Sequence, residues 1–444
     1  MRIVIVGAGA VGSYLAERLS TEGQDVVVIE DDEVVAARLQ DEHDILVVRG
    51  NGASPAVLLE AGADKAELVI AVSNNDGANV LACHAAGELG VKRTIARIED
   101  PELRDALAGL NVDVAIDPGE AAAHELVNLV RQSGVSELVE FGEGRLLLIG
   151  ATVPAASPLA GEPLSELRSR HGAWNWVVAA LVRHGLTIVA HGATVVEAGD
   201  HVLLMVTAAD FERASTLIGV RHHDIRRVVV MGSTRVAELA TRFLLEAGFD
   251  VVQIDEDPDR CRKLAERHSR ALVLCDDPTD PSTLRSLQLG ESDAVLALTG
   301  WDEVNVLACL TAKALGAFTT IARFNRIDYV GLLGGVGIDA AISSRLSAAA
   351  AILRYVRRGR IHSVATFSDT DAEAIEFEVD PSSRAAGCSV IDLGLPRGTV
   401  IGGVIRDGQA FVPGGSFVIE SGDRVIFFAL PGAIAATEKL LLPK

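Results

Sequence analysis

The stretch DGANVLACHAAGELGVKRTIARI, residues 76–98, returns as DEVNVLACLTAKALGAFTTIARF at residues 302–324, and 13 of the 23 aligned positions are identical. The similarity continues in both directions, since VIVGAGAVG from Val4 pairs with VVMGSTRVA from Val229. The chain of 444 residues is therefore one unit of about 220 residues written twice, and each unit is expected to fold alike.

The first part of each unit alternates short apolar strands with amphipathic helical patterns. In the first copy the strands are RIVIV, DVVVIE, ILVVRG, ELVIAVS and RTIARI, and VGSYLAERLSTEG is one of the helices between them. This alternation predicts a doubly wound parallel sheet. The composition agrees: with 49% apolar but only 4% aromatic residues, the cores must consist of Ala, Val, Ile and Leu.

The second part of each unit, about residues 136–219 and 362–442, has short alternating strands broken by HG, DG, GG and GD, which predicts a small α+β module of hairpins. Between the parts lie two amphipathic helices, residues 122–133 and 345–358, which are either plain linkers or crossing helices that need a partner. We expect an α/β chain of two tandem Rossmann-like domains, each followed by an α+β module, with boundaries at 1–133, 134–219, 225–358 and 359–444.

Charge and composition exclude several classes of function. A net charge of −21 disfavours nucleic acid and anionic membrane surfaces as partners. The chain opens directly on an apolar strand, without the regions of a signal peptide, and no uncharged run approaches the ~18 to 20 residues that span a bilayer. We therefore expect a cytoplasmic protein without direct bilayer insertion. The cysteines form no metal-ligand motif and are expected to be reduced thiols: Cys83, Cys261, Cys275, Cys309 and Cys388.

GAGAVG, residues 7–12, follows a strand and opens a helix, and the next strand ends in the acid Glu30, 18 residues after the third glycine. The first glycine permits a tight turn, the second lets the backbone approach a pyrophosphate, and the third lets the helix pack closely. The helix N-terminus attracts phosphates, and the acid accepts hydrogen bonds from a ribose diol. The expected ligand is NAD(H) or an adenine nucleotide such as ATP or ADP, the alternative being an empty Rossmann pocket. The expected contacts are Gly7, Gly9, Ala10, Val11, Gly12 and Glu30.

Later strands of the first copy end in further polar residues, which the parallel sheet should bring to the pocket mouth: Asn51, Ser73, Asp76, Asn79 and Arg97. Asp76 is equally consistent with the N-cap of the following helix. The guanidinium of Arg97 could reach a terminal phosphate, or could form an ion pair at the strand end.

The second copy keeps only part of this pattern. Of its three glycine positions only the first is still glycine, while Thr234 and Ala237 narrow the approach to the loop. The acid, the strand-end hydroxyl and the arginine persist, so we expect weakened binding there, the alternatives being a smaller or different ligand or no ligand. The candidate contacts are Gly232, Asp255, Thr299 and Arg323.

Catalytic motifs are missing from the sequence. It contains no GxxxxGK[ST], HExxH or GxSxG, and the histidines of the first module stand apart without partners at motif spacing: His171, His184, His191 and His201. A nucleotide site without catalytic groups indicates a sensor.

GAGAVG, the acid Glu30, RGNGASP, VSNNDGANVLA, the IAR strand and VEAGD, all repeated in tandem, resemble the TrkA family of bacterial Trk potassium uptake systems. The resemblance implies tandem RCK domains without catalytic activity that assemble into a tetrameric gating ring, or a dimer of dimers, beneath a membrane subunit of the TrkH or TrkG type. ATP, ADP or NADH would shift that ring between conformations. Two positions depart from the family pattern: the second glycine loop, and Glu99, where some members carry an arginine.

Two rival functions share parts of this pattern. An NAD-dependent oxidoreductase would have the same glycine loop. An RCK-type regulator of a different ion channel or transporter would differ only in its membrane partner.

Overall fold

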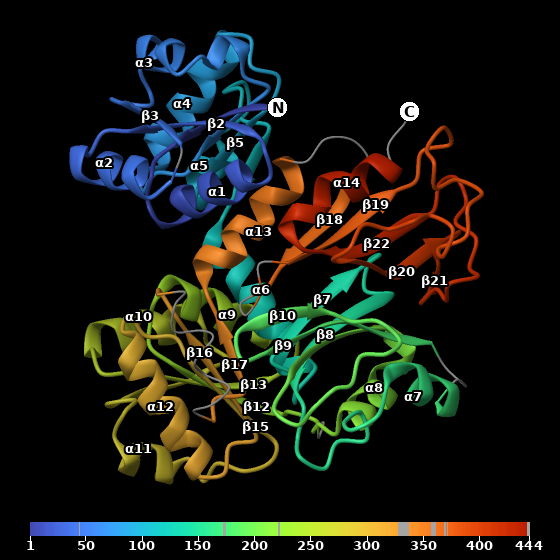
Figure 1. The fold of residues 1–444 in the computed structure, drawn as a ribbon. Coiled ribbons are helices and arrows are strands. Elements are labelled where there is room, and N and C mark those ends of the chain that lie inside the picture. Colours follow the sequence, from blue (N-terminus) through green and yellow to red (C-terminus); the bar gives the residue numbers. More distant parts are fainter. Residues whose placement is uncertain are drawn as a thin grey trace. The chain divides into compact units, whose positions relative to one another are not determined.

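The computed structural model describes residues 1–43, 45–171, 175–220, 223–326, 337–356, 361–367, 370 and 372–441. Two parallel sheets and two antiparallel sheets alternate along the chain (Figure 1). The expected fold class, two tandem Rossmann-like domains each followed by an α+β module, is confirmed.

The first parallel sheet has the strand order β3-β2-β1-β4-β5-β6. Its strands are β1 (Arg2–Val6), β2 (Asp25–Glu30), β3 (Leu46–Arg49), β4 (Leu68–Ala71), β5 (Thr94–Arg97) and β6 (Val114–Ile116). The connections are α1 (Ala10–Thr21), α2 (Glu33–Glu42), α3 (Pro55–Glu60), the 3₁₀ turn Ala63–Lys65, α4 (Asp76–Glu88) and α5 (Pro101–Asp105). The chain order reverses between β1 and β4, and open α/β sheets bind ligands at the carboxyl ends of the strands at such a reversal.

The second parallel sheet repeats this order as β14-β13-β12-β15-β16-β17. The strands are β12 (Arg227–Met231), β13 (Asp250–Asp255), β14 (Leu272–Cys275), β15 (Asp293–Ala297), β16 (Thr319–Arg323) and β17 (Ala340–Ile342). The helices are α9 (Arg235–Glu246), α10 (Pro258–Arg267), α11 (Pro281–Ser286) and α12 (Asp302–Ala314). The central strands are buried runs of Val, Met, Leu and Ala, as the composition predicted.

The two antiparallel sheets form the modules. The first has the order β10-β9-β11-β8-β7, from β7 (Glu137–Phe141), β8 (Leu146–Thr152), β9 (Trp176–Arg183), β10 (Leu186–Val189) and β11 (His201–Thr207), with α7 (Leu164–Arg170), the 3₁₀ turn Ala208–Asp210 and α8 (Phe211–Ile218). The second has the order β18-β19-β22-β20-β21, from β18 (Ile361–Thr366), β19 (Glu373–Glu378), β20 (Thr399–Arg406), β21 (Gln409–Phe411) and β22 (Arg424–Ala429), with α14 (Pro431–Leu441).

In each module an arginine at the end of one strand binds, through two of its nitrogens, the aspartate that precedes the neighbouring strand. Arg183 donates to both carboxylate oxygens of Asp200, from Nε at 2.8 Å and from Nη2 at 2.7 Å, and Arg406 does the same to Asp423. Burial alone would raise the pKa of Asp200, but the Arg183 guanidinium and the main-chain N–H of Glu197 lower it. The aspartates that end the VEAGD segment (residues 196–200) and the IESGD segment (residues 419–423) therefore stabilise the modules.

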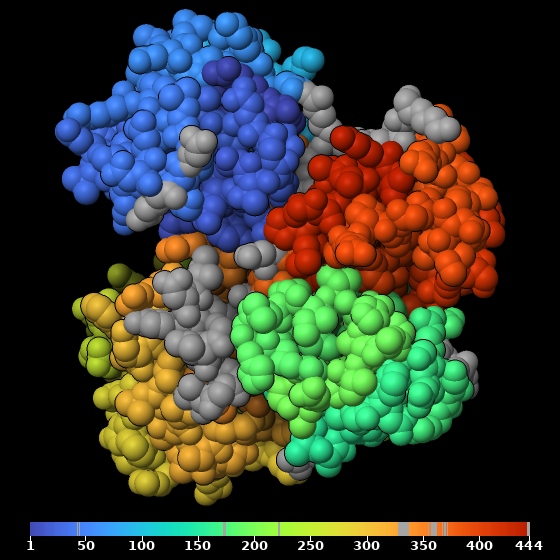
Figure 2. Space-filling view, viewed as in Figure 1, coloured from blue at the N-terminus to red at the C-terminus, as the bar shows by residue number. Residues whose placement is uncertain are grey.

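The two modules share one hydrophobic core. Phe141, Leu146 and Met205 of the first module cluster with Ile405 and Phe428 of the second. In Figure 2 the green surface of the first module meets the orange-red surface of the second. The two halves of the chain are therefore joined through apolar burial between their modules.

The two crossing helices, α6 (Pro118–Arg131) and α13 (Ser344–Val356), each leave the domain that precedes them in the sequence. The part of α6 from Ala122 onward is buried in one core with α9, and the His124 ring stacks on Phe243 at 4.2 Å between centroids. Reciprocally, the described part of α13 from Arg345 onward belongs to the compact unit that holds Met1–Ala121, and Arg93 Nη1 donates to the Tyr355 carbonyl at 2.5 Å.

The halves of the chain therefore exchange their crossing helices, which resolves the choice between linker and partnered helix for α6. The expected helix end at 358 and module start at 359 fall on residues 357–360, which lie outside the described residues, as does Leu442.

Truncation of the apolar face of α6 tests this packing. Leu126→Ala removes a side chain that is 0% exposed and should lower the free energy of unfolding by about 2–5 kcal/mol. Leu186→Ala, at a position 71% exposed on β10, should change it by less than about 0.5 kcal/mol. Thermal unfolding followed by circular dichroism compares the two, and equal midpoints would contradict the packing of α6.

Candidate functional site

Glycine occupies the three positions of the first loop for different structural reasons. Gly7 has a positive φ of +97°, and a Cβ there would lie 2.9 Å from the Ser73 nitrogen. A Cβ at Gly12 would lie 1.9 Å from the Gly7 oxygen. Gly9, in contrast, has an ordinary φ of −66°, and no described heavy atom would lie within 4 Å of its Cβ. The protein's own packing therefore requires the first and third glycines, while the second faces open space that a ligand can fill.

Helix α1 begins at this open position. Its N-cap is Gly9, and no side chain of the described residues makes a capping hydrogen bond there. Helix α2, by comparison, is capped by the Asp32 carboxylate, and α4 by the Asn75 side chain. The first turn of α1, including Ala10 and Val11, thus offers backbone N–H groups and the positive end of the helix dipole to an anion.

The acid Glu30 lies where the Rossmann pattern requires it, at the end of β2. Its Oε2 accepts from the Ala8 main-chain nitrogen at 2.5 Å, and its Oε1 accepts from Asp31 and Asp32 at 3.0 Å each. A carboxylate offers about four acceptor positions, so three backbone donors leave room for one more. Glu30 therefore fastens the glycine loop to β2 and retains capacity for one ribose hydroxyl.

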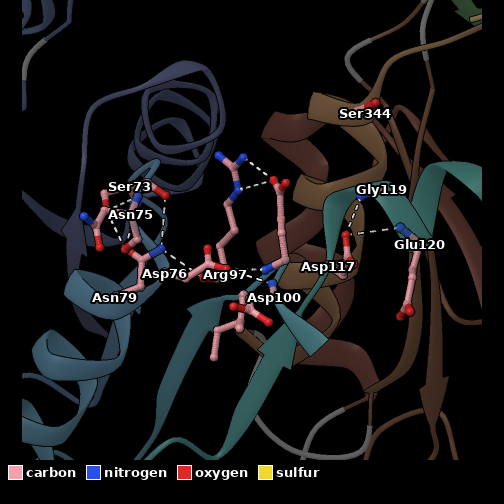
Figure 3. A network of polar contacts seen from close by, with 12 residues as sticks. Ser73, Asn75, Asp76, Asn79, Arg97, Asp100, Asp117, Gly119, Glu120 and Ser344 are labelled. Atoms are coloured by element: carbon pink, nitrogen blue, oxygen red, sulfur yellow. Dashed lines mark hydrogen bonds and ion pairs between the residues drawn. The ribbon is translucent and has the colours of Figure 1, made fainter. Parts of the chain in front are cut away.

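Asn79 is fully buried and joins the ends of β4 and β5 (Figure 3). Its Oδ1 accepts from the Ser73 nitrogen at 2.9 Å and from Ser73 Oγ at 2.7 Å. Its Nδ2 donates to the Ser73 carbonyl at 3.0 Å and to the Arg97 carbonyl at 2.9 Å. All hydrogen-bonding positions of the amide are used, so Asn79 positions the pocket wall and has none left for a ligand.

Asp76 is the first residue of α4, and the N-cap is its neighbour Asn75, whose Oδ1 accepts from the Ala78 nitrogen at 2.9 Å. The alternative that Asp76 itself caps the helix is therefore wrong. The Asp76 carboxylate instead accepts from the main-chain nitrogens of Glu99 at 2.8 Å and Asp100 at 2.9 Å. It holds the loop after β5 against α4.

Arg97 forms an ion pair with Glu99 at the carboxyl end of β5 (Figure 3). Its Nε donates to Glu99 Oε1 at 3.0 Å, and its Nη2 bonds the same oxygen. The strand-end ion pair weighed from the sequence is thus present. A phosphate on this guanidinium would have to compete with the Glu99 carboxylate.

Asn51 lies exposed after β3, where its Oδ1 accepts from the Ala53 nitrogen at 2.9 Å. This contact forms the turn into α3. Asn51 lies beside the carboxyl end of β3 as expected, but its side-chain oxygen stabilises a turn.

A second ionic network connects the rim of this pocket to the crossing helix. Asp100 caps α5 by accepting from the Glu102 nitrogen at 2.9 Å. Arg104, on α5, donates to Asp117 at 3.0 Å and to Glu120 at 2.8 Å, and both acids stand at the start of α6. The contacts of Asp76 with Glu99 and Asp100 therefore continue through α5 to α6.

The second pocket differs where a ligand would bind. Gly232 keeps the positive φ of +98°, but the hydroxyl of Thr234 caps α9 by accepting from the Ala237 nitrogen and donates to the Leu298 carbonyl at 2.7 Å. The first turn of α9 thus already has a side-chain partner. Asp255, 5% exposed, accepts from the Asp257 nitrogen at 3.0 Å.

The contacts that shape the wall are the same in both pockets. Asn305 bonds Thr299 and the Arg323 carbonyl just as Asn79 bonds Ser73 and the Arg97 carbonyl. Arg323 donates to Asn325 Oδ1 at 3.0 Å, in the place where the first copy has Glu99. The copies thus share their framework and differ in the loop and in the arginine's partner.

Several residues that matter here were not predicted from the sequence. They are Asn75, the caps Asp32 and Asp100, and Arg104 with its acids Asp117 and Glu120. Asx residues directly before helices are a readable signal for the caps. Nothing in the spacing of the chain predicts the pairing of Arg104 with α6.

Burial raises the pKa of the Cys83 and Cys309 thiols to about 12 each, which agrees with inert core thiols. Among the described residues no group of three or more His, Cys, Asp and Glu side chains could hold a metal ion.

The open space at Gly9 leads to a binding prediction. Gly9→Val should leave the melting temperature near that of the unsubstituted protein but weaken nucleotide binding about tenfold or more, because the side chain occupies the ligand's approach. Gly12→Val, which would clash with the Gly7 carbonyl, should instead impair folding. Calorimetric titration and thermal melting of both variants decide this. Unchanged affinity in Gly9→Val would show that no ligand approaches the loop.

The buried amide leads to a stability prediction. Asn79→Ala leaves the Ser73 N–H and the Arg97 carbonyl without their partner and should lower the free energy of unfolding by roughly 1–3 kcal/mol. Asn51→Ala, at the exposed turn, serves as the matched control and should have a much smaller effect. Chemical denaturation measures both, and equal losses would contradict the structural role of Asn79.

Family models match both parts of each unit. The TrkA-N domain model matches residues 3–118 and 228–344, and the TrkA-C domain model matches residues 148–219 and 374–442. Within the described residues no helix is long and apolar enough to cross a membrane.

Similar proteins cover the chain nearly from end to end. It is 33% identical to the Trk system potassium uptake protein TrkA of Vibrio alginolyticus, over 96% of this chain and 95% of that protein. Its identity to the protein of the same name from Halomonas elongata is 34%, over 97% and 96%.

Among solved structures, a GsuK channel bound to NAD is similar with a TM-score of 0.57 and 19% identity, covering 99% of this chain and 78% of that one. The domain models and full-length relatives together show that the chain belongs to the TrkA family of Trk potassium uptake proteins.

Proposed function

We propose that this protein is a nucleotide-sensing regulatory subunit of a Trk-type potassium uptake system, controlling ion flux through a separate membrane subunit of the TrkH or TrkG type. The carrying observation is the first glycine loop, where an uncapped α1 and an open position at Gly9 form an anion site in a chain of this family. The chain would act in the cytoplasm as a homo-tetramer, arranged either as a symmetric ring or as a dimer of dimers.

The ligand proposed for the first pocket is NAD(H), ATP or ADP. The pyrophosphate would lie on the first turn of α1, and the adenosine ribose would reach the remaining acceptor position of Glu30. Similar GsuK structures, one bound to NAD and one bound to ADP, support nucleotides of both kinds.

The acids around this pocket already have hydrogen-bond partners in the main chain, which fits a sensing function better than a catalytic one. Glu30 and Asp76 both accept hydrogen bonds from main-chain N–H groups, which hold each carboxylate in a structural role. We therefore propose no catalytic residue. An oxidoreductase would reveal itself by a substrate-dependent change in NADH absorbance.

The route by which a bound nucleotide would act starts at the Arg97–Glu99 pair. A phosphate that draws the Arg97 guanidinium from Glu99 would alter the loop that Asp76 holds by two main-chain hydrogen bonds. That loop leads into α5, whose Arg104 is tied to the start of α6. Since α6 is a crossing helix, its displacement is a change that an assembled ring could transmit.

The competition for Arg97 can be measured with two variants. Arg97→Ala should weaken ATP more than AMP, by roughly 1.5–3 kcal/mol, if the guanidinium contacts a terminal phosphate. Glu99→Gln removes the competing charge and should strengthen ATP more than AMP. Titration calorimetry gives both differences, and variants that change ATP and AMP alike would assign Arg97 a purely structural role.

Potassium flux in a reconstituted complex tests the proposed function directly. We expect at least one of ATP, ADP and NADH to change the flux through the cognate membrane subunit, and Glu30→Ala to blunt that response while the complex still assembles. Arg104→Ala should bind nucleotide but respond less, because it loses the ties between α5 and α6.

Flux that ignores every nucleotide, in a complex confirmed to be assembled, would contradict the sensor function. Regulation of an ion other than potassium would point to the rival RCK-type regulator.

A further inference from the structure

Two cysteine thiols lie together at the rim of the second Rossmann domain. Cys261 is on α10, and Cys275 ends β14 directly beside Asp255 of β13. The Cys275 sulfur lies 3.9 Å from the carbonyl oxygen of Glu256, the residue that follows Asp255. The Cys261 sulfur also lies 3.1 Å from the Asp255 carbonyl oxygen and 3.8 Å from that of Leu274. Packing of α10 against β14 therefore holds both sulfurs in one corner.

The two cysteines differ in their access to solvent. Cys275 is exposed, while Cys261 is buried at 7% exposure. Burial, followed by the neighbouring Cys275 thiol, raises the pKa of Cys261 to about 11. A reagent in solution would therefore meet Cys275 first, and Cys261 would be the second thiol to react.

This pair is particular to the second copy. Ala36 and Arg49 occupy the equivalent positions of the first domain, where Arg49 is paired in the sheet with Glu30 and forms an ion pair with Glu33 at 2.9 Å. The framework therefore does not need sulfur at these two places.

We propose that Cys261 and Cys275 form a reversible disulfide, by exchange with a small oxidised thiol such as glutathione disulfide. The Cys275 thiolate attacks one sulfur of that disulfide, which forms a mixed disulfide and releases one molecule of the small thiol. Cys261 then loses its proton to solvent and attacks the Cys275 sulfur, which releases the second molecule. Two protein thiols are oxidised and one disulfide is reduced, so the exchange balances.

The disulfide would change the rim of the second pocket. It would tie the carboxyl end of β14 to α10 and would remove the S–H group that donates to the Asp255 carbonyl. The part of the second copy that keeps the ribose acid would therefore respond to the thiol redox state, whether or not a nucleotide binds there.

The test uses the purified full chain, incubated with glutathione disulfide or with reduced glutathione and then alkylated. We expect the oxidised protein to lose the mass of two hydrogen atoms, peptide mapping to join Cys261 to Cys275, and dithiothreitol to reverse the bond. Cys275→Ser, at an exposed position, should fold normally and form no internal disulfide. Cys388→Ser, with the pair intact, should still form it.

Three results would overturn the proposal. The first is a stable glutathione adduct on Cys275 with Cys261 still available to alkylation in the unfolded, quenched protein. The second is an internal disulfide that joins other cysteines in the unsubstituted chain. The third is no reaction at either residue over a range of glutathione redox ratios that oxidises an exposed control dithiol peptide.

Discussion

The close contact between Gly12 and the Gly7 carbonyl is the constraint on which the first pocket depends. A Cβ at Gly12 would stand 1.9 Å from that oxygen, so only glycine lets α1 start so near the end of β1. With the helix in this place, its uncapped N-terminus opens at the carboxyl edge of the sheet, next to the space at Gly9. Glu30 then fixes the loop from the other side through the Ala8 nitrogen.

The duplication separates what the fold needs from what a ligand needs. The buried amides Asn79 and Asn305 make equivalent hydrogen bonds in both copies, because strand ends without these partners would leave buried polar groups unpaired. The loop of the first copy is under no such structural demand at its second glycine position, where the second copy has Thr234. The copies also differ at the third position, where Ala237 replaces Gly12. Thr234 supplies a cap to α9 where Gly9 leaves α1 open, and on this difference we assign the proposed nucleotide site to the first half.

The sequence was sufficient to predict the repeat, the parallel sheets and the glycine loop, because periodicity and glycine spacing report directly on backbone geometry. The sequence placed Asn79 and Asp76 near the ends of β4 and β5, but it predicted neither their position in the first turn of α4 nor the direction of their side chains. Spacing does not reveal whether a polar group at a sheet edge turns to solvent or back to the main chain. The exchange of α6 between halves was equally hidden, since an apolar helix face shows that a partner exists but not which one it is.

We propose that one chain carries one competent nucleotide pocket, in its first half. The most direct measurement is the stoichiometry of NADH and ATP binding to the purified full-length protein by titration calorimetry, with protein concentration determined independently. The single intact glycine loop predicts about one nucleotide per chain. Two sites of equal affinity, or a single site that persists when Gly9 is replaced by valine, would contradict it.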